Sequence, residues 1–205
     1  MTQGKIILLN GASSSGKSSI VKELQTILSE AYLEAGIDKF LFMLPNDYLM
    51  KAHLWHQVIG YEKRENGELL PKVGDHGHQL MRGMHRAIAA LAQAGNNVVA
   101  DHVLLDKLWL DDCQAVFDGF EVLFVGIMCP LEVLEAREKG RGDRTLGQAK
   151  GQAGIIHQNC IYDIEVDTSQ LSAAECAEQI KARLYKGQFT AFDRMRATQQ
   201  KRDTA

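Results

Sequence analysis

The sequence predicts an α/β fold, with a five-stranded parallel sheet and helices on both faces. Short apolar runs alternate along the chain with segments whose apolar residues recur at helical spacing. One run, residues 122–128, is apolar almost throughout, which is typical of a strand that helices cover on both faces. The chain has 205 residues, 45 % of them hydrophobic, enough to bury a sizeable core in one domain.

The N-terminal part of the chain predicts two strands, the first followed by a turn and a helix and the second by an aspartate. Residues 5–9 form a short apolar run bounded by glycine, and residues 18–29 carry apolar side chains at the spacing of a helix. Residues 32–37 form the second apolar run, which ends at Asp38. A strand, a turn and a helix therefore open the chain, and Asp38 is expected at the end of the second strand.

The remaining elements continue the alternation. A long helical segment at residues 77–94 ends in a sequence typical of a helix C-cap and leads to a third strand at residues 97–100. Residues 122–128 are the fourth strand. The elements expected after it are helices at residues 130–137, 148–157 and 172–184 and a fifth strand at residues 161–166.

Two stretches do not follow this alternation. Residues 46–75 are polar, contain scattered glycines and have weak periodicity, so we expect an inserted helical or lid region at about 46–80. Residues 186–205 are polar and charged and are expected to form a C-terminal tail with a mobile tip. The sequence thus predicts one domain at residues 1–185.

Charge and composition exclude several classes of protein. The net charge is −3, which gives no basic excess of the kind that nucleic-acid binding uses and favours a small phosphorylated ligand. No apolar run is long enough to span a membrane and no secretory signal is apparent, so a cytoplasmic protein is expected. The four cysteines are far apart, which predicts reduced, mostly buried thiols. The sequence leaves open whether the protein forms a homo-oligomer.

The stretch "NGASSSGKSS" predicts a triphosphate-binding loop. Gly11, Gly16, Lys17 and Ser18 match G-x-x-x-x-G-K-[ST], and the match lies between a predicted strand and a predicted helix, as the motif requires. Backbone N–H groups and the helix N-terminus would bind phosphate, Lys17 would reach the β- and γ-phosphates, and Ser18 would bind Mg²⁺. The other loop residues expected at the nucleotide are Ala12, Ser13, Ser14, Ser15 and Ser19. The alternative is a serine-rich turn that caps a helix.

Arginines and carboxylates indicate which phosphate chemistry follows. The sequence contains no N-K-x-D or D-x-x-G string, which disfavours a GTP switch. Arg137, Arg141 and Arg144 lie close together beside glycines, where they could close over a transferring phosphoryl group, or else form a solvated basic turn. Asp38 and Asp101 each follow a predicted strand, so either could accept a proton or help to hold Mg²⁺, unless it is a surface or capping residue.

Several strings together resemble the chloramphenicol phosphotransferase family of P-loop kinases, from the N-terminus to about residue 185. They are "IILLNGASSSGKSSIV", "GID", "VGIMCPLEVLEARE", "RGDRTLGQAKGQ" and "HQNCIYDIEVDTS". The resemblance implies a three-layer, nucleotide-kinase-like P-loop fold, close to shikimate and adenylate kinases. It further implies that Asp38 is the base that activates the acceptor hydroxyl and that Arg141 and Arg144 are lid arginines. The segment from Asp167 through Thr168 to Ser169 would border the adenine. Residues 40–80 resemble the family less, so the acceptor stays open.

We therefore expect an ATP- and Mg²⁺-dependent kinase that phosphorylates a hydroxyl of a small molecule, as chloramphenicol 3-O-phosphotransferases do. Lys17 and the lid arginines would stabilise charge in the transition state, Arg137 would contact the nucleotide, and Ser18 with Asp101 would serve the metal. The alternatives are a nucleotide or sugar kinase and a non-catalytic ATP-binding sensor. Retention of both Asp38 and the arginines argues against a sensor, which needs no base.

The inserted region contains four histidines and three aromatic residues that could serve a binding site. The histidine pairs are His53 with His56 and His76 with His78. They could hold a metal, line an acceptor cleft, or be ordinary surface and packing residues. The aromatic residues are Tyr48, Trp55 and Tyr61, which could stack on a planar acceptor or pack in the core or the lid.

Overall fold

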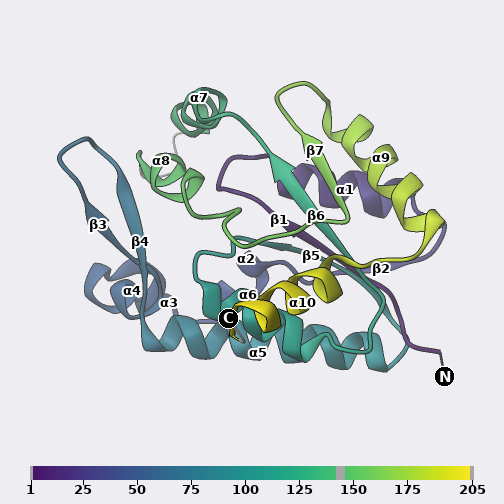
Figure 1. Cartoon of the computed structure of the whole chain (residues 1–205). Helices are drawn as coiled ribbons and strands as arrows, with labels where there is room; N and C mark the ends of the chain where they lie inside the picture. Colours follow the sequence, from purple (N-terminus) through teal and green to yellow (C-terminus); the bar gives the residue numbers. More distant parts are fainter. Residues whose placement is uncertain (1, 142–145, 204–205) are drawn as a thin grey trace.

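The computed structural model describes residues 2–141 and 146–203 and confirms the predicted fold class (Figure 1). Five parallel strands form one sheet in the order β2-β5-β1-β6-β7. Their bounds are β1 (Ile6–Asn10), β2 (Tyr32–Glu34), β5 (Asn97–His102), β6 (Val122–Met128) and β7 (Ile164–Asp167). In the register, Leu9 of β1 is paired with Asp101 and Asn10 with His102, so the ends of β1 and β5 lie side by side.

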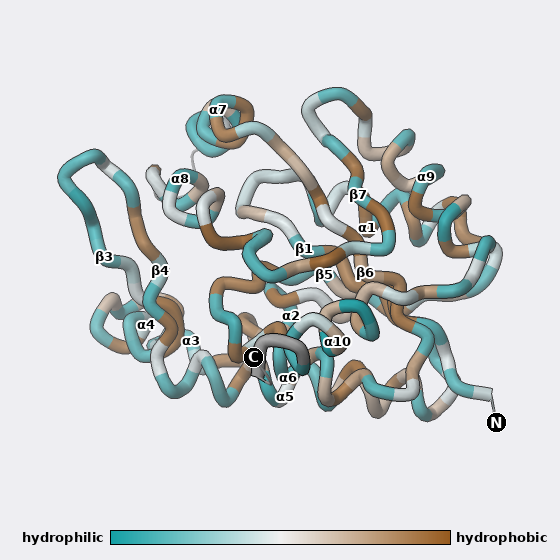
Figure 2. The backbone as a smooth tube through the Cα atoms, viewed as in Figure 1, coloured by the Kyte–Doolittle hydropathy of each residue, from teal (hydrophilic) through white to brown (hydrophobic). Residues whose placement is uncertain are grey.

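Alternating side chains of the sheet form two separate cores. Ile6 and Leu8 of β1 face one layer of helices, and Ile7 and Leu9 face the other. The first layer consists of α5 (Asp75–Gln93), α6 (Lys107–Val116) and α10 (Ala191–Asp203), and the second of α1 (Lys17–Ile27) and α9 (Ala173–Lys186). The apolar strands lie between these helices in Figure 2. This burial holds the loops at the carboxyl ends of the strands on a rigid base.

Several elements differ from the sequence-based expectation. The helix expected at 148–157 ends at Ala153, and the strand expected at 161–166 begins at Ile164. Three further segments differ more. The sequence pattern did not indicate α6, whose N-terminus is capped by Asp106 through a 2.8 Å bond from the Leu108 N–H. The strand expected at 32–37 ends at Glu34, because Gly36 passes over the end of β5 and a short helix, α2 (Ile37–Leu41), follows. The expected polar tail contains α10, whose Phe192 and Met195 are buried in the core.

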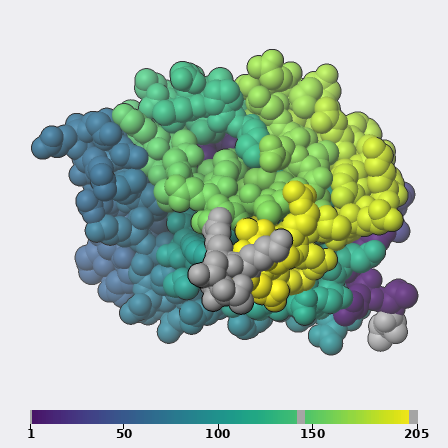
Figure 3. All heavy atoms as spheres, in the orientation of Figure 1, coloured from purple at the N-terminus to yellow at the C-terminus, as the bar shows by residue number. Residues whose placement is uncertain are grey.

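The inserted region contains both helix and strand. It comprises α3 (Asn46–Met50), α4 (Ala52–Ile59) and an antiparallel hairpin of β3 (Gly60–Lys63) and β4 (Leu69–Val73). The hairpin projects beyond the rest of the molecule at the left of Figure 3. The division of the chain into a kinase domain, an insertion and a tail stays a prediction.

The turn end of the hairpin lies against the segment that follows α7 (Leu131–Arg141). The N–H of Leu69 donates a 3.1 Å bond to the carbonyl of Gly147, at the start of α8 (Gln148–Ala153). A side chain on Gly151 of α8 would collide with the Leu69 carbonyl, so only glycine allows this approach. The hairpin, α8 and the end of α7 thus form one wall beside the carboxyl ends of the strands.

Two expectations about the whole chain can also be compared with the structure. All four cysteines are free thiols, and Cys113 and Cys176 are buried while Cys129 and Cys160 are half-buried. Within residues 2–141 and 146–203, no helix has both the length and the apolar character needed to cross a bilayer.

Candidate active site

The loop between β1 and α1 has the backbone of a phosphate-binding turn. Gly16 has a φ of 92° and Ser14 a φ of 63°, both in the left-handed region. Lys17 is the first residue of α1 and is 6 % exposed, and its ammonium donates 2.8 Å bonds to the carbonyls of Gly11 and Ala12. A positive charge is therefore held at the end of the loop, above the N-terminus of a helix.

Two hydroxyls of the loop support the fit to a phosphate group. Among the residues that the structure describes, the buried hydroxyls of Ser14 and Ser15 have no hydrogen-bond partner. The Ser13 N–H donates a 2.7 Å bond to Oε1 of Gln152, a buried residue of α8. Buried polar groups normally have partners, so unsatisfied donors beside an ammonium suit an anionic ligand.

Asp101 and Ser18 form the oxygen-rich side of the loop. The Ser18 hydroxyl donates a 3.2 Å bond to Oδ2 of Asp101, which is 7 % exposed. Burial raises the pKa of Asp101, the charge of Lys17 opposes this rise, and Asp38 adds to it. Hydroxyl and carboxylate oxygens are the donors that Mg²⁺ prefers, so Ser18 and Asp101 fit the metal that was expected.

Asp38 lies at this edge for a different reason than the one expected. It is the second residue of α2 and does not directly follow a strand. The backbone turns at Gly36, where an added Cβ would collide with Oδ1 of Asp101, and the exposed carboxylate of Asp38 then enters the same region. Asp101 also differs from the expectation, because β5 continues through His102 and includes it.

One cavity of about 390 Å³ brings most of these residues together. Its polar lining consists of the loop residues Ser13 to Ser19 except Ser15, with Asp38, Asp101, Arg141, Gln148 and Gln152. Its apolar lining, called the apolar wall below, consists of Ile37, Leu41, Phe42, Leu49, Trp55, Ile59, Tyr61, Val103 and Leu105. The apolar wall comes largely from α2 and the inserted region.

A second cavity of about 410 Å³ lies on the other side of the loop. Arg137 donates bonds of 3.0 Å to the Thr168 hydroxyl and 2.6 Å to its carbonyl, and both residues line this cavity. Asp167 instead accepts bonds from the N–H and hydroxyl of Ser169, which hold the turn after β7. This cavity is where the resemblance predicts the adenine, and the contact expected of Asp167 stays a prediction.

The arginine segment is only partly described. Arg141 lines both cavities, so its side chain lies between the two. Arg144 lies outside the described residues. Glu138, which the sequence did not single out, is 2 % exposed and accepts bonds of 2.8 and 2.9 Å from the N–H groups of Gly147 and Ala149. It fixes the start of α8 after the arginine segment, a role that no motif indicated because it depends on chain folding.

Some aromatic residues of the inserted region line the first cavity, whereas its histidines lie elsewhere. Trp55 and Tyr61 line the first cavity, whereas the ring of Tyr48 lies 5.5 Å from that of His76. His78 accepts a 3.1 Å bond from the indole N–H of Trp109, which is a packing role. In the described parts of the chain, none of the four histidines lines this cavity or belongs to a cluster with metal-binding geometry.

Comparison of the sequence with known proteins gives consistent matches. A family model described as "Chloramphenicol phosphotransferase-like protein" matches residues 4–185. Two curated proteins from strains of Mycobacterium tuberculosis, whose names assign them provisionally as O-phosphotransferases, are 34 % identical over 201 residues, covering 96 % of this chain and 89 % of theirs. The matched residues include the phosphate-binding loop, Asp38 and the arginine segment.

Solved structures show the same fold at lower identity. An APS kinase of Mycobacterium tuberculosis, solved with AMPPNP and APS, has a TM-score of 0.62 and 19 % identity, covering 90 % of this chain and 99 % of that one. A gluconokinase from Sinorhizobium meliloti has a TM-score of 0.60 and 18 % identity over 91 % of this chain and 94 % of its own. These neighbours are kinases with a nucleotide-binding P-loop fold.

Proposed function

The chain belongs to the chloramphenicol phosphotransferase-like family, and we propose that it transfers the γ-phosphate of ATP to a hydroxyl of a small, uncharged molecule with an apolar, flat part. The family and the fold support a phosphotransferase with a kinase fold. The single observation that carries the finer proposal is the first cavity, which is lined both by Lys17, Asp38 and Asp101 and by the apolar wall containing Trp55 and Tyr61.

The chain's own residues supply most of the chemistry in this proposal. Lys17 and the loop amides bind the β- and γ-phosphates, and Arg141 stabilises charge on the transferring group from between the two cavities. Asp38 accepts the proton of the acceptor hydroxyl while the hydroxyl oxygen forms the new bond to the γ-phosphorus. The bond between the γ-phosphorus and the bridging oxygen breaks, and ADP leaves with that oxygen. Ser18 and Asp101 would hold Mg²⁺, which neutralises negative charge on the phosphates.

The charged and apolar residues that line the first cavity indicate which class of acceptor it would bind. In the described residues, the cationic side chains that line it are Lys17 and Arg141, which the transferred phosphate requires. A phosphorylated sugar, an acid or a nucleotide would need further cations to balance its own charge. The apolar wall, with one indole and two phenyl-type rings at Trp55, Phe42 and Tyr61, favours a neutral acceptor that stacks on them. Chloramphenicol is one molecule of this class.

An acceptor panel tests the proposal directly. Purified protein with ATP and Mg²⁺ is assayed for ADP release with chloramphenicol, neutral aromatic alcohols, gluconate, shikimate and nucleoside monophosphates. We expect turnover with members of the neutral aromatic group. Turnover confined to gluconate, shikimate or nucleoside monophosphates would refute the acceptor class, and ATP binding without turnover on any acceptor would favour the sensor.

Asp38→Asn tests the proposed base on the active acceptor. The amide keeps the shape and removes the basicity, so we expect normal ATP binding and a loss of turnover of about 10²-fold or more. Asp47→Asn is the matched control, because Asp47 is an exposed carboxylate paired with Lys51 on the neighbouring α3. Equal turnover in both variants would remove Asp38 from the mechanism.

A further inference from the structure

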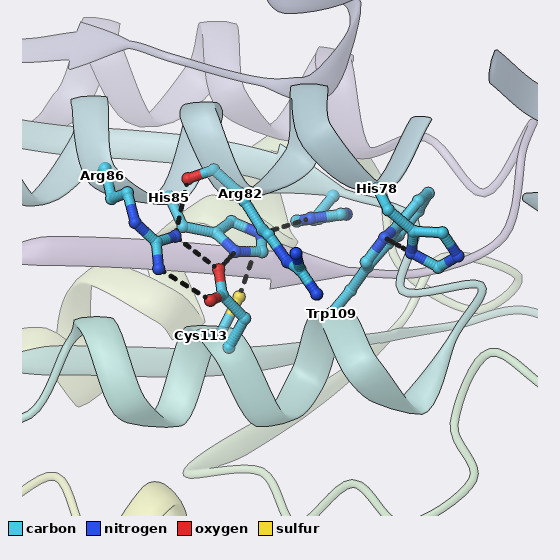
Figure 4. A network of polar contacts seen from close by, with 8 residues as sticks. His78, Arg82, His85, Arg86, Trp109 and Cys113 are labelled. Carbon is cyan, nitrogen blue, oxygen red and sulfur yellow. Dashed lines mark hydrogen bonds and ion pairs between the residues drawn. The ribbon is translucent and has the colours of Figure 1, made fainter. Parts of the chain in front are cut away.

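A buried chain of polar side chains runs from the surface of α6 to the end of β5 (Figure 4). His85 of α5 lies between Asp112 of α6 and His102 of β5, and both rings are fully buried. Nδ1 of His85 lies 2.7 Å from Oδ2 of Asp112, and Nε2 of His85 lies 3.0 Å from Nε2 of His102. The mechanism proposed above does not use any of these three residues.

The hydrogen bonds determine where the protons are. The Val103 N–H donates a 2.8 Å bond to Nδ1 of His102, so the proton of that ring is on Nε2 and points at His85. His85 then accepts at Nε2 and donates from Nδ1 to Asp112. Burial lowers the pKa of both rings, which fits two neutral tautomers. Burial alone would raise the pKa of Asp112, but the bonds from Arg86 and His85 lower it overall.

The alternative is that His85, His102 and Cys113 bind a metal ion. Nε2 of His85, Nε2 of His102 and Sγ of Cys113 all lie within 4.8 Å of one another, and the described residues contain no other such group of three or more His, Cys, Asp or Glu side chains. However, a ligating His102 would have to lose the Nε2 proton while the Val103 N–H still occupies Nδ1, which leaves an imidazolate. Neutral hydrogen bonding therefore accounts better for the observed contacts.

The polar chain ends at a turn that belongs to the active site. His102 and Asp101 are neighbours in β5, so their side chains point to opposite faces, one toward α5 and α6 and the other toward Ser18. The residues after His102 leave the sheet, and Leu104 is held by a 3.0 Å bond from its N–H to Oδ1 of Asn10. Val103 and Leu105 line the first cavity. The His102 ring therefore anchors the strand end that carries Asp101 and part of the acceptor wall.

We propose that the hydrogen-bonded chain of Asp112, His85 and His102 positions the end of β5, so that Asp101 meets Mg²⁺·ATP and Val103 meets the acceptor. His102 and His85 are positioning residues, and Asp112 acts through them. The expected effect on turnover rests on the phosphotransfer proposed above. The expected effect on the position of Asp101 also changes Mg²⁺-dependent ATP binding, which can be measured with ATP and Mg²⁺ alone.

Two substitutions of His102 break different bonds. In His102→Asn, the amide oxygen can still accept from Val103, but no N–H reaches His85. In His102→Gln, an amide N–H stands near the Nε2 position and can still donate to His85. We expect His102→Asn to lose about 10- to 100-fold in kcat and His102→Gln to recover part of this loss. If both variants fold and keep wild-type kcat, the proposal fails.

Two matched variants on α6 test whether Asp112 affects the active site through His85. Asp112→Ala removes the acceptor of the His85 proton, whereas Asp111→Ala removes the next carboxylate along the helix, which is bonded only to Lys107 in the described contacts. We expect Asp112→Ala to lower kcat about 10-fold and Asp111→Ala to match wild type. A lower Tm with unchanged kcat in Asp112→Ala would mean that the residue is merely structural and would overturn the proposal.

Two readouts need no acceptor and separate this proposal from the phosphotransfer proposal. Calorimetry gives the ratio of ATP affinities with Mg²⁺ and with EDTA, and we expect His102→Asn to reduce this ratio several-fold while leaving the EDTA value unchanged. Two-bond ¹H–¹⁵N NMR spectra of the wild type should show the proton of His102 on Nε2 and that of His85 on Nδ1. An unchanged ratio, the opposite tautomers, or one equivalent of zinc in the purified protein would overturn the proposal. A wild type that turns over no acceptor would refute the phosphotransfer alone.

Discussion

Gly36→Ala is the substitution whose effect follows most directly from the structure. A methyl group on Gly36 would collide with Oδ1 of Asp101 and lie 3.0 Å from its Cγ, where two carbons need about 3.5 Å or more. The backbone of Gly36 has φ −73° and ψ 165°, which alanine adopts without strain, so the whole effect comes from the contact. The neighbouring Ala35 N–H is bonded to the Val99 carbonyl at 3.0 Å, which limits movement of the backbone.

The carboxylate of Asp101 must therefore move. Its bond from Ser18 is already 3.2 Å long and would be lost. Overpacking of this kind costs about 1–3 kcal/mol, and each kcal/mol lowers the Tm of a chain of this size by about 2–4 °C. A displacement of about 1 Å in a group that serves the reacting phosphate can cost about 10²-fold in rate. We expect a modest loss of stability and a large loss of Mg²⁺-dependent activity.

The measurements are kcat on the active acceptor, ATP affinity with and without Mg²⁺, and Tm. Gly83→Ala on α5 is the matched control, because an added Cβ there meets nothing within 4 Å and a helical alanine stabilises by about 0.5–1 kcal/mol. A Gly36→Ala protein with wild-type kcat and wild-type Mg²⁺ dependence would refute the assignment of Asp101 to the metal side of the site.

Three further predictions follow from other contacts. Lys17→Ala should nearly abolish turnover on every acceptor in steady-state assays while the protein still folds, because no other described cation lies on the loop; wild-type kcat would refute the loop's role. Arg141→Ala should lower kcat by about 10²-fold with ATP affinity within a few-fold, and equal losses in calorimetric affinity and rate would indicate a ground-state contact. Burial, and next the charge of Lys17, lowers the pKa of His157, so the unfolded state binds the proton more readily and stability should fall as the pH drops below about 6.5. His157→Gln should show a smaller decrease of Tm between pH 7 and pH 5 than wild type, and an equal decrease would contradict the shift.

Local sequence patterns were sufficient for most of the fold. The strand at Val122–Met128 has the bounds that its apolar run predicted, because a strand buried on both faces must be apolar along its whole length. The phosphate-binding loop could also be predicted from the sequence, since its glycines and lysine lie within a single turn. By contrast, α6 was missed and the strand at residue 32 was extended too far, because burial against α5 and the close approach of Gly36 to Asp101 decide those two segments.

The fold class, the phosphate-binding loop and a set of candidate charged residues could be predicted from the sequence, because each depends on periodicity or on spacing within a few residues. Which of these side chains meet depends on the tertiary structure. Asp38 and Asp101 lie 63 positions apart in the sequence and come together because Gly36 crosses the end of β5. Trp55 and Tyr61 face the loop because an inserted region packs beside it, and His85 meets His102 because α5 covers β5. Contacts between distant segments depend on how the helices pack on the sheet, and no local pattern records that packing.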